Sequence, residues 1–176
     1  MRTPVALLAG CGLLAACSSM ALRSPTASAN LGPTKGSQAA GTVTFVQRGE
    51  KVVVDARITG LAPGLHGFHV HEKGDCTAPD ASSAGAHFNP QKAPHGSPDS
   101  PQRHAGDLGN LTADANGLAV YHAEVSGITL DTGADSIIAR AVIVHANPDD
   151  LRTQPSGNAG PRVACGLISK GKDQWF

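Results

Sequence analysis

Seven side chains between residues 69 and 145 of this 176-residue chain stand out as candidate metal ligands. They are six histidines and one aspartate, spaced His69-x-His71, His87, His95, His104-x-x-Asp107 and His145. Neutral imidazole is a good ligand for zinc and copper, whereas carboxylates alone favour harder ions. The mixture of residue types therefore indicates a site for zinc or copper.

His69 and His71 belong to a segment that alternates like a β-strand, Leu65-His-Gly-Phe-His-Val-His71. The two-residue period places both imidazoles on one face of the strand, where they can hold one ion. His66 is an odd number of residues from both, so we expect it to point away and to be a hydrogen-bonded structural histidine. His145 ends an apolar run, which predicts a place at the end of a buried strand.

The other candidate ligands lie in a stretch rich in glycine, proline, alanine and serine. His87, His95, His104 and Asp107 offer three imidazoles and a carboxylate, enough for a closed four-coordinate zinc site. Six imidazoles and one carboxylate are too many for one tetrahedral ion and too few for two, unless one ligand is shared. Because an imidazolate has two nitrogens, a bridging histidine would give four nitrogens to a tetragonal copper and three, with the carboxylate, to zinc.

Four motifs keep a fixed order along the chain. They are Gly67-Phe-His-Val-His71, Gly85-Ala-His-Phe-Asn-Pro90, His104-Ala-Gly-Asp-Leu-Gly-Asn110 and Gly157-Asn-Ala-Gly-Pro-Arg-Val-Ala-Cys-Gly166. In order and spacing they closely resemble the copper/zinc superoxide dismutases, and the resemblance runs over residues 41–168. It implies eight antiparallel strands in Greek-key order, one copper and one zinc per domain, and the disproportionation of superoxide to O2 and H2O2.

The resemblance also implies roles for individual residues. Copper, which changes oxidation state, would be held by His69, His71, His87 and His145, and a structural zinc by His87, His95, His104 and Asp107. His87 would be the bridge and would exchange a proton during catalysis. Asp149 matches a carboxylate that hydrogen-bonds one copper and one zinc histidine, and Arg162 matches an arginine that attracts the anionic substrate. Without the resemblance, these two would be a turn-capping carboxylate and an ordinary arginine at the start of a strand.

One segment departs from the animal-type pattern. Only residues 152–156, Arg-Thr-Gln-Pro-Ser, separate Leu151 from Gly157, where those enzymes carry a longer segment with charged steering residues. Their usual lysine has no counterpart here, and Pro155 takes its approximate place. Arg152 and Lys92 are the candidates for replacing that charge.

Two other function classes are open on the sequence alone. One is a copper/zinc-binding or copper-delivery envelope lipoprotein without turnover, and the other is an interaction module, since sandwich folds host many functions. The complete ligand set and Arg162 argue against both. A storage protein needs no arginine for a substrate, and an interaction module needs no metals.

Residues 1–16 have the pattern of an export signal. Arg2 precedes an apolar stretch at residues 5–16, which is shorter than the ~20 residues needed to span a bilayer. Leu14-Ala-Ala-Cys17 resembles the lipobox of bacterial lipoproteins, in which the cysteine is lipidated. Cys11 and an ordinary secretory signal are the alternatives. We therefore expect an exported protein of the bacterial cell envelope or periplasm, anchored to the membrane through Cys17.

The rest of the chain predicts an all-β sandwich or flattened barrel. Residues 17–37 are rich in small and polar residues and indicate a flexible tether with a possible weak strand at 27–31, followed by a domain at 38–176. Strand-like runs are separated by turn signals, and none has a helical stripe. The runs lie at 42–46, 52–58, 67–71, 107–112, 118–125, 137–145 and 162–169. Two long segments, 72–106 and 146–161, interrupt them, and loops of this length are usually functional.

Cysteine content and charge narrow the remaining possibilities. Cys11 and Cys17 belong to the targeting segment, which leaves Cys76 and Cys165 as an expected disulfide in an oxidising compartment. Closing a loop of about 90 residues would contribute ~4–5 kcal/mol on chain-entropy grounds. With 14 basic and 14 acidic residues, the chain has no evident basic face, so no nucleic-acid partner is expected. Family members include monomers and homodimers, so either state is open.

Overall fold

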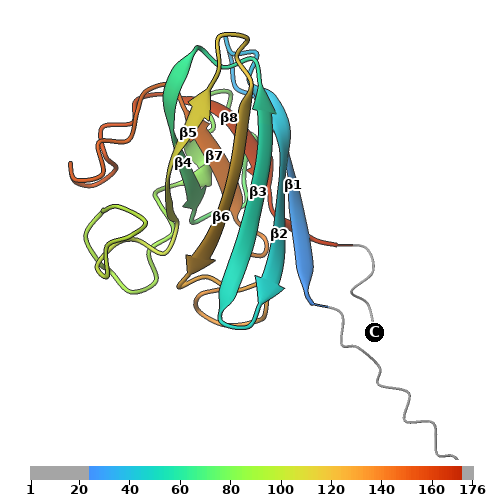
Figure 1. The fold of residues 1–176 in the computed structure, drawn as a ribbon, viewed down its shortest axis with the longest axis vertical. Helices are drawn as coiled ribbons and strands as arrows, with labels where there is room; N and C mark the ends of the chain where they lie inside the picture. Colours follow the sequence, from blue (N-terminus) through green and yellow to red (C-terminus); the bar gives the residue numbers. More distant parts are fainter. Residues whose placement is uncertain (1–23, 172–176) are drawn as a thin grey trace, which may run out of the picture.

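The computed structural model describes residues 24–171, and β-strands form its regular framework (Figure 1). The strands are β1 (Thr26–Pro33), β2 (Ala40–Arg48), β3 (Lys51–Thr59), β4 (Gly64–His71), β5 (Asp107–Ala113), β6 (Ala119–Ser126), β7 (Ala141–His145), β8 (Arg162–Leu167) and the two-residue β9 (Ser169–Lys170). One short 3-10 turn, η1 (Ser82–Ala84), lies in the loop after β4. The expected export signal and Cys17 lie outside the described residues.

The sheet closes on itself into a barrel. Its strands follow one another in the order β2-β3-β6-β5-β4-β7-β8-β1, and β1 also pairs with β2. Every one of these pairings is antiparallel. The neighbours β3–β6 and β4–β7 are not consecutive in the sequence, as expected for Greek-key connections. The predicted all-β fold with eight antiparallel strands is therefore confirmed, and β9 adds only a short pairing to β1.

Alternating side chains build an aliphatic core inside this barrel. In β3, every second residue from Val52 to Ile58 is buried, and the residues that alternate with them are partly or fully exposed. Aromatic residues contribute little, although Phe68 packs edge-on against Tyr121 with ring centroids 5.3 Å apart. The two-residue period thus decides which face of each strand enters the core.

The segment expected to be a tether contributes a full strand. β1 covers residues 26–33, longer than the weak strand predicted at 27–31, and it pairs with β2, β8 and β9. Ala27, Ala29 and Leu31 alternate into the core. The barrel therefore begins at about residue 26 rather than at 38, because pairing on both sides compensates for small side chains with weak strand preference.

A second expectation about the strands was also wrong in part. The run predicted at 137–145 is a strand only from Ala141, because residues 137–140 turn before it. Ile137 is fully buried, but its backbone N–H donates to the carbonyl of Thr129 and Ala139 has a positive φ of 61°. Ile137 is thus a core residue supplied by a loop, a case in which apolar periodicity does not reveal the break.

The two long loops have the predicted bounds. Residues 72–106 connect β4 to β5, and residues 146–161 connect β7 to β8. Both loops project from the left side of the barrel in Figure 1, where β4 and β7 are hydrogen-bonded neighbours. Three candidate ligands, His87, His95 and His104, belong to the first loop, and the others lie on the strands that these loops connect. Within the described part of the chain, no helix has the length and apolarity to cross a membrane.

Candidate metal centre

One group of four buried histidines forms where β4 and β7 run side by side. Phe68 and Val70 of β4 enter the core, so the alternate residues of that strand face outward, beneath the loops. A histidine from the loop after β4 joins them through an isolated bridge to the strand. One potential ligand atom from each residue lies within 4.8 Å of the others; the group is His69, His71, His87 and His145.

A second group forms around the first residue of β5, Asp107. Its Oδ1 lies 2.9 Å from Nδ1 of His87, 3.1 Å from Nδ1 of His95 and 3.2 Å from Nδ1 of His104. The Nδ1 atoms of His87 and His104 are 3.4 Å apart. A tetrahedral zinc with bonds of ~2.0–2.1 Å requires ligand atoms about 3.3 Å apart, so these residues fit a zinc ion.

The histidines of the first group each leave one ring nitrogen free. Nδ1 of His71 donates to the carbonyl of Gly85 and Nδ1 of His145 donates to that of Gly160. Their Nε2 atoms therefore carry lone pairs, and these two atoms lie 3.4 Å apart. Two lone pairs at this separation would repel unless a cation lies between them, so the arrangement fits a bound metal ion.

Buried ring nitrogens without a hydrogen-bond partner also indicate metal binding. Nδ1 of His69, Nε2 of His87 and Nδ1 of His95 are buried and have no hydrogen-bond partner among residues 24–171. Leaving such an atom unsatisfied is costly, and buried polar atoms without partners are rare. His87 is the shared residue: its Nδ1 is in the second group, and its Nε2 is the unpartnered atom near the first. His87 is thus placed where it would bridge two metal ions, as ligand counting predicted.

The Asp149 carboxylate connects the two groups through hydrogen bonds to one histidine of each. Its Oδ2 accepts a hydrogen bond of 2.7 Å from Nε2 of His69, and its Oδ1 accepts one of 2.9 Å from Nε2 of His95. Both rings are thereby fixed with Nδ1 free for a metal. A Cβ atom at Gly157, where φ is +66°, would overlap Oδ1 of Asp149 and Nε2 of His95, so this approach requires glycine.

The electrostatics of the two groups differ. Burial lowers the pKa of His69 to about 3 and that of His145 to about 4, so both rings are neutral ligands at pH 7. Burial opposes protonation of His95 as well, but the adjacent carboxylates of Asp107 and Asp149 outweigh it and raise its pKa to about 9. The two carboxylates thus stabilise positive charge in the second group. A zinc ion bound there would provide that charge.

Comparison with known families agrees with this geometry. The model of the copper/zinc superoxide dismutase family matches residues 39–168. The chain belongs to this family. It is accordingly a superoxide dismutase, with the first group as its copper site and the second group as its zinc site. The enzyme converts superoxide to O2 and H2O2 with a copper that changes oxidation state next to a structural zinc.

His66 is a hydrogen-bonded structural histidine, as predicted, because both of its ring nitrogens contact backbone carbonyls.

A cavity of about 490 Å³ opens beside the copper site of the enzyme. Its lining includes His71, His87 and His145 together with Arg162, which is the only lysine or arginine among the described residues that line it. Neither Arg152 nor Lys92 belongs to the lining, whereas Pro155 does. The two cations considered as replacements for the missing lysine therefore do not face the cavity.

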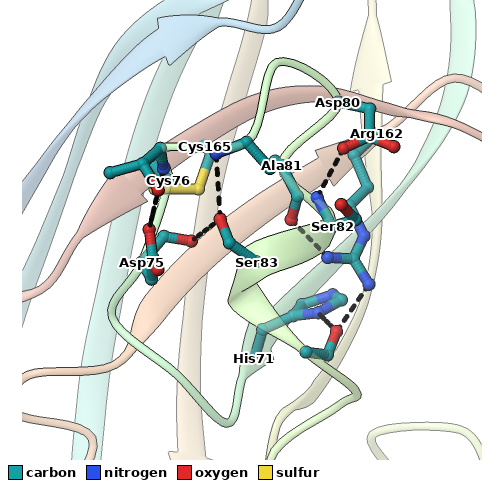
Figure 2. Close-up of a disulfide and its surroundings, with 12 residues drawn as sticks. His71, Asp75, Cys76, Asp80, Ala81, Ser82, Ser83, Arg162 and Cys165 are labelled. Atoms are coloured by element: carbon teal, nitrogen blue, oxygen red, sulfur yellow. Dashed lines mark hydrogen bonds between the residues drawn. A yellow bond between two sulfur atoms is a disulfide. The ribbon is translucent and has the colours of Figure 1, made fainter.

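The disulfide holds the segment that positions Arg162. Cys76 and Cys165 are bonded, which confirms the predicted pair, and Cys165 lies three residues after Arg162 in β8. The Arg162 guanidinium donates to the carbonyls of Ala81 and Gly85, both in the loop that follows Cys76. Figure 2 shows the guanidinium between this loop and His71. The bond thus joins the loop to the strand that carries Arg162.

Cys76→Ser should lower the stability of the metal-free enzyme by ~2–5 kcal/mol, because the disulfide restricts a loop of 89 residues in the unfolded chain. Calorimetry should show a melting temperature lower by several degrees or more. Cys165→Ser and the double variant should give the same decrease, since all three lack one bond. Labelling of free thiols at both positions in the oxidised, unmutated enzyme would contradict the pairing.

Several residues near the metals were not found from the sequence. Asn110 exchanges two hydrogen bonds with the backbone of Asp149, of 2.7 and 2.9 Å, and its position in the motif that begins at His104 could have drawn attention to it. Glu72 and Asn89 line the cavity. Asn89 lies within the motif that begins at Gly85, whereas no sequence pattern distinguishes Glu72.

Proposed function

We propose that this superoxide dismutase acts outside the cytoplasm, anchored to the bacterial cell envelope through a lipid on Cys17, and removes superoxide there. The observation that carries the proposal is the disulfide between Cys76 and Cys165, since such bonds persist in oxidising compartments. The export pattern of residues 1–16 and the lipobox-like sequence ending at Cys17 support it.

We further propose how the cavity residues take part in turnover. Copper, when bound, supplies one-electron redox chemistry, so that one superoxide is oxidised to O2 and a second, with two protons, is reduced to H2O2. Arg162 binds the anion by charge in the cavity that the copper histidines line. Nε2 of His87 has no hydrogen-bond partner in the described part of the chain, so it can hold a proton whenever it is not a ligand. Asp149 keeps His69 in the orientation that ligation requires.

Charge around the cavity supports capture by one residue rather than by a charged loop. Arg162 shares the lining with one carboxylate, Glu72, and with uncharged Asn89 and Ser156. An arginine attracts a small anion over roughly one Debye length, ~8–10 Å at ordinary salt. A metal-storage or delivery protein would have no use for such an anion site, which favours the enzymatic function.

The anchor can be tested by expressing the full chain in bacteria with radioactive palmitate. We expect label on the unmutated protein and on Cys11→Ser, but none on Cys17→Ser, which should appear in the soluble envelope fraction. Label lost only in Cys11→Ser would move the lipid to Cys11, and an unlabelled unmutated protein would contradict the anchor.

The homodimer stays a prediction, which sedimentation of the purified protein would test.

A further inference from the structure

The shortened segment before Gly157, residues 152–156, makes a contact that could not be predicted from its sequence. The side-chain amide of Gln154 pairs with the backbone of His95, 59 residues away. The His95 N–H donates to Oε1 of Gln154 at 2.8 Å, and Nε2 of Gln154 donates to the His95 carbonyl at 2.9 Å. One side chain thus satisfies both backbone polar groups of a zinc ligand.

His95 is therefore held by the 146–161 loop at both its ring and its backbone. Asp149 accepts the hydrogen bond from Nε2 of the ring, and Gln154 fixes the peptide groups on either side of the Cα atom. With both constrained, Nδ1 of His95 can point only toward the other zinc ligands, and it lies 3.1 Å from Oδ1 of Asp107. The histidine has little freedom to swing away and release the ion.

The turn that carries Gln154 is built from its own contacts. Oδ1 of Asp150 accepts from the backbone N–H groups of Arg152 and Thr153, and Asp150 and Gly157 are linked by a backbone hydrogen bond of 2.8 Å. Gln154 also donates to the carbonyl of Arg152 at 3.1 Å. The turn therefore presents the amide already oriented, so that little conformational entropy is lost in making the two bonds to His95.

We infer that Gln154 is a positioning residue for zinc: it locks the backbone of His95 and so slows zinc release from the dismutase. The shortened loop, which contributes no lysine or arginine to the cavity lining, would serve to retain the metal. Partners that orient metal ligands without touching the metal typically change affinity by ~10–100-fold when they are removed. The inference rests on the same zinc site as the proposed function, but zinc release is measured without superoxide, so the two can fail separately.

The test uses the enzyme loaded with copper and zinc and a chromogenic zinc chelator in excess at pH 7. Gln154→Met keeps the length of the side chain and removes both bonds, so zinc should leave ~10-fold faster. Gln154→Glu keeps an acceptor for the His95 N–H but cannot donate to its carbonyl, and should give an intermediate rate. Copper release should stay within about twofold of the unmutated rate in both variants, because no copper ligand bonds to Gln154.

Gln102→Met is the matched control, because Gln102 is exposed in the loop that carries the zinc ligands and its side chain makes no hydrogen bond within the described residues. It should release zinc at the unmutated rate. Equal zinc release from Gln154→Met and Gln102→Met would overturn the inference. So would parallel acceleration of zinc and copper release, which would indicate general loosening of the fold. If Gln154→Met does not fold, an unchanged rate of zinc release from Gln154→Glu is enough to overturn the inference.

Discussion

Arg162→Ile should leave copper and zinc bound and lower superoxide turnover at least severalfold. Arg162 supplies the only lysine or arginine charge in the described lining of the cavity, and removing it removes the attraction for the anion. Arg162→Glu should lower turnover further, because repulsion replaces attraction. Pulse radiolysis with metal analysis of each protein measures both quantities. Arg152→Ile is the matched control, since Arg152 is exposed and outside the cavity lining, and it should turn over normally.

Salt provides an independent check on the same residue. Turnover by the unmutated enzyme should fall as ionic strength rises, since screening weakens the field of Arg162 beyond ~8–10 Å. With no additional lysine in the shortened loop to face the cavity, the decrease should be weaker than a full set of loop charges would give. Arg162→Ile should show still less dependence. Equal turnover by the unmutated enzyme, Arg162→Ile and Arg162→Glu, all with full metal content, would remove this residue from catalysis.

His87→Ala should lower the affinity for both metals and reduce superoxide consumption to near background. His87 belongs to both ligand groups, so a single substitution takes one nitrogen from each site. It also removes the unpartnered Nε2 that we propose as a proton carrier. Metal analysis after dialysis, followed by a turnover assay in added copper and zinc, separates the two losses.

The control for His87→Ala is a histidine outside both metal groups. His122 lies on β6 with its side chain largely exposed and its Nδ1 bonded to Asp55, so His122→Ala should retain both metals and normal turnover. Full copper and zinc together with undiminished activity in His87→Ala would show that the histidine is not shared.

Much of the metal centre could be predicted from the sequence because its information is local. The two-residue strand period is enough to place His69 and His71 on one face, and the positions of the loop ligands repeat a family pattern. The number of ligands alone, seven for two four-coordinate ions, then requires a shared histidine. The fold class follows in the same way from short strand-like runs separated by turn signals.

The features that were missed depend on contacts between distant residues. β1 is made of small residues, and only its pairing with β2 and β8 shows why it is a strand. The turn at residues 137–140 is fixed by hydrogen bonds to Thr129 and Ile168 rather than by a glycine or proline. The link from Gln154 to His95 spans 59 residues and uses a residue type with many ordinary roles. No local pattern carries any of this.

The most direct test of the shared histidine is the magnetic coupling between the two metals. Cobalt is placed in the zinc site beside Cu(II), and the electron paramagnetic resonance spectrum and magnetic susceptibility are recorded with both sites full. Because one imidazole ring separates the two ions, we predict coupled spins in the unmutated enzyme and loss of that coupling in His87→Ala. Independent copper and cobalt spins in the fully loaded, unmutated enzyme would contradict the bridge and, with it, the assignment of the two sites.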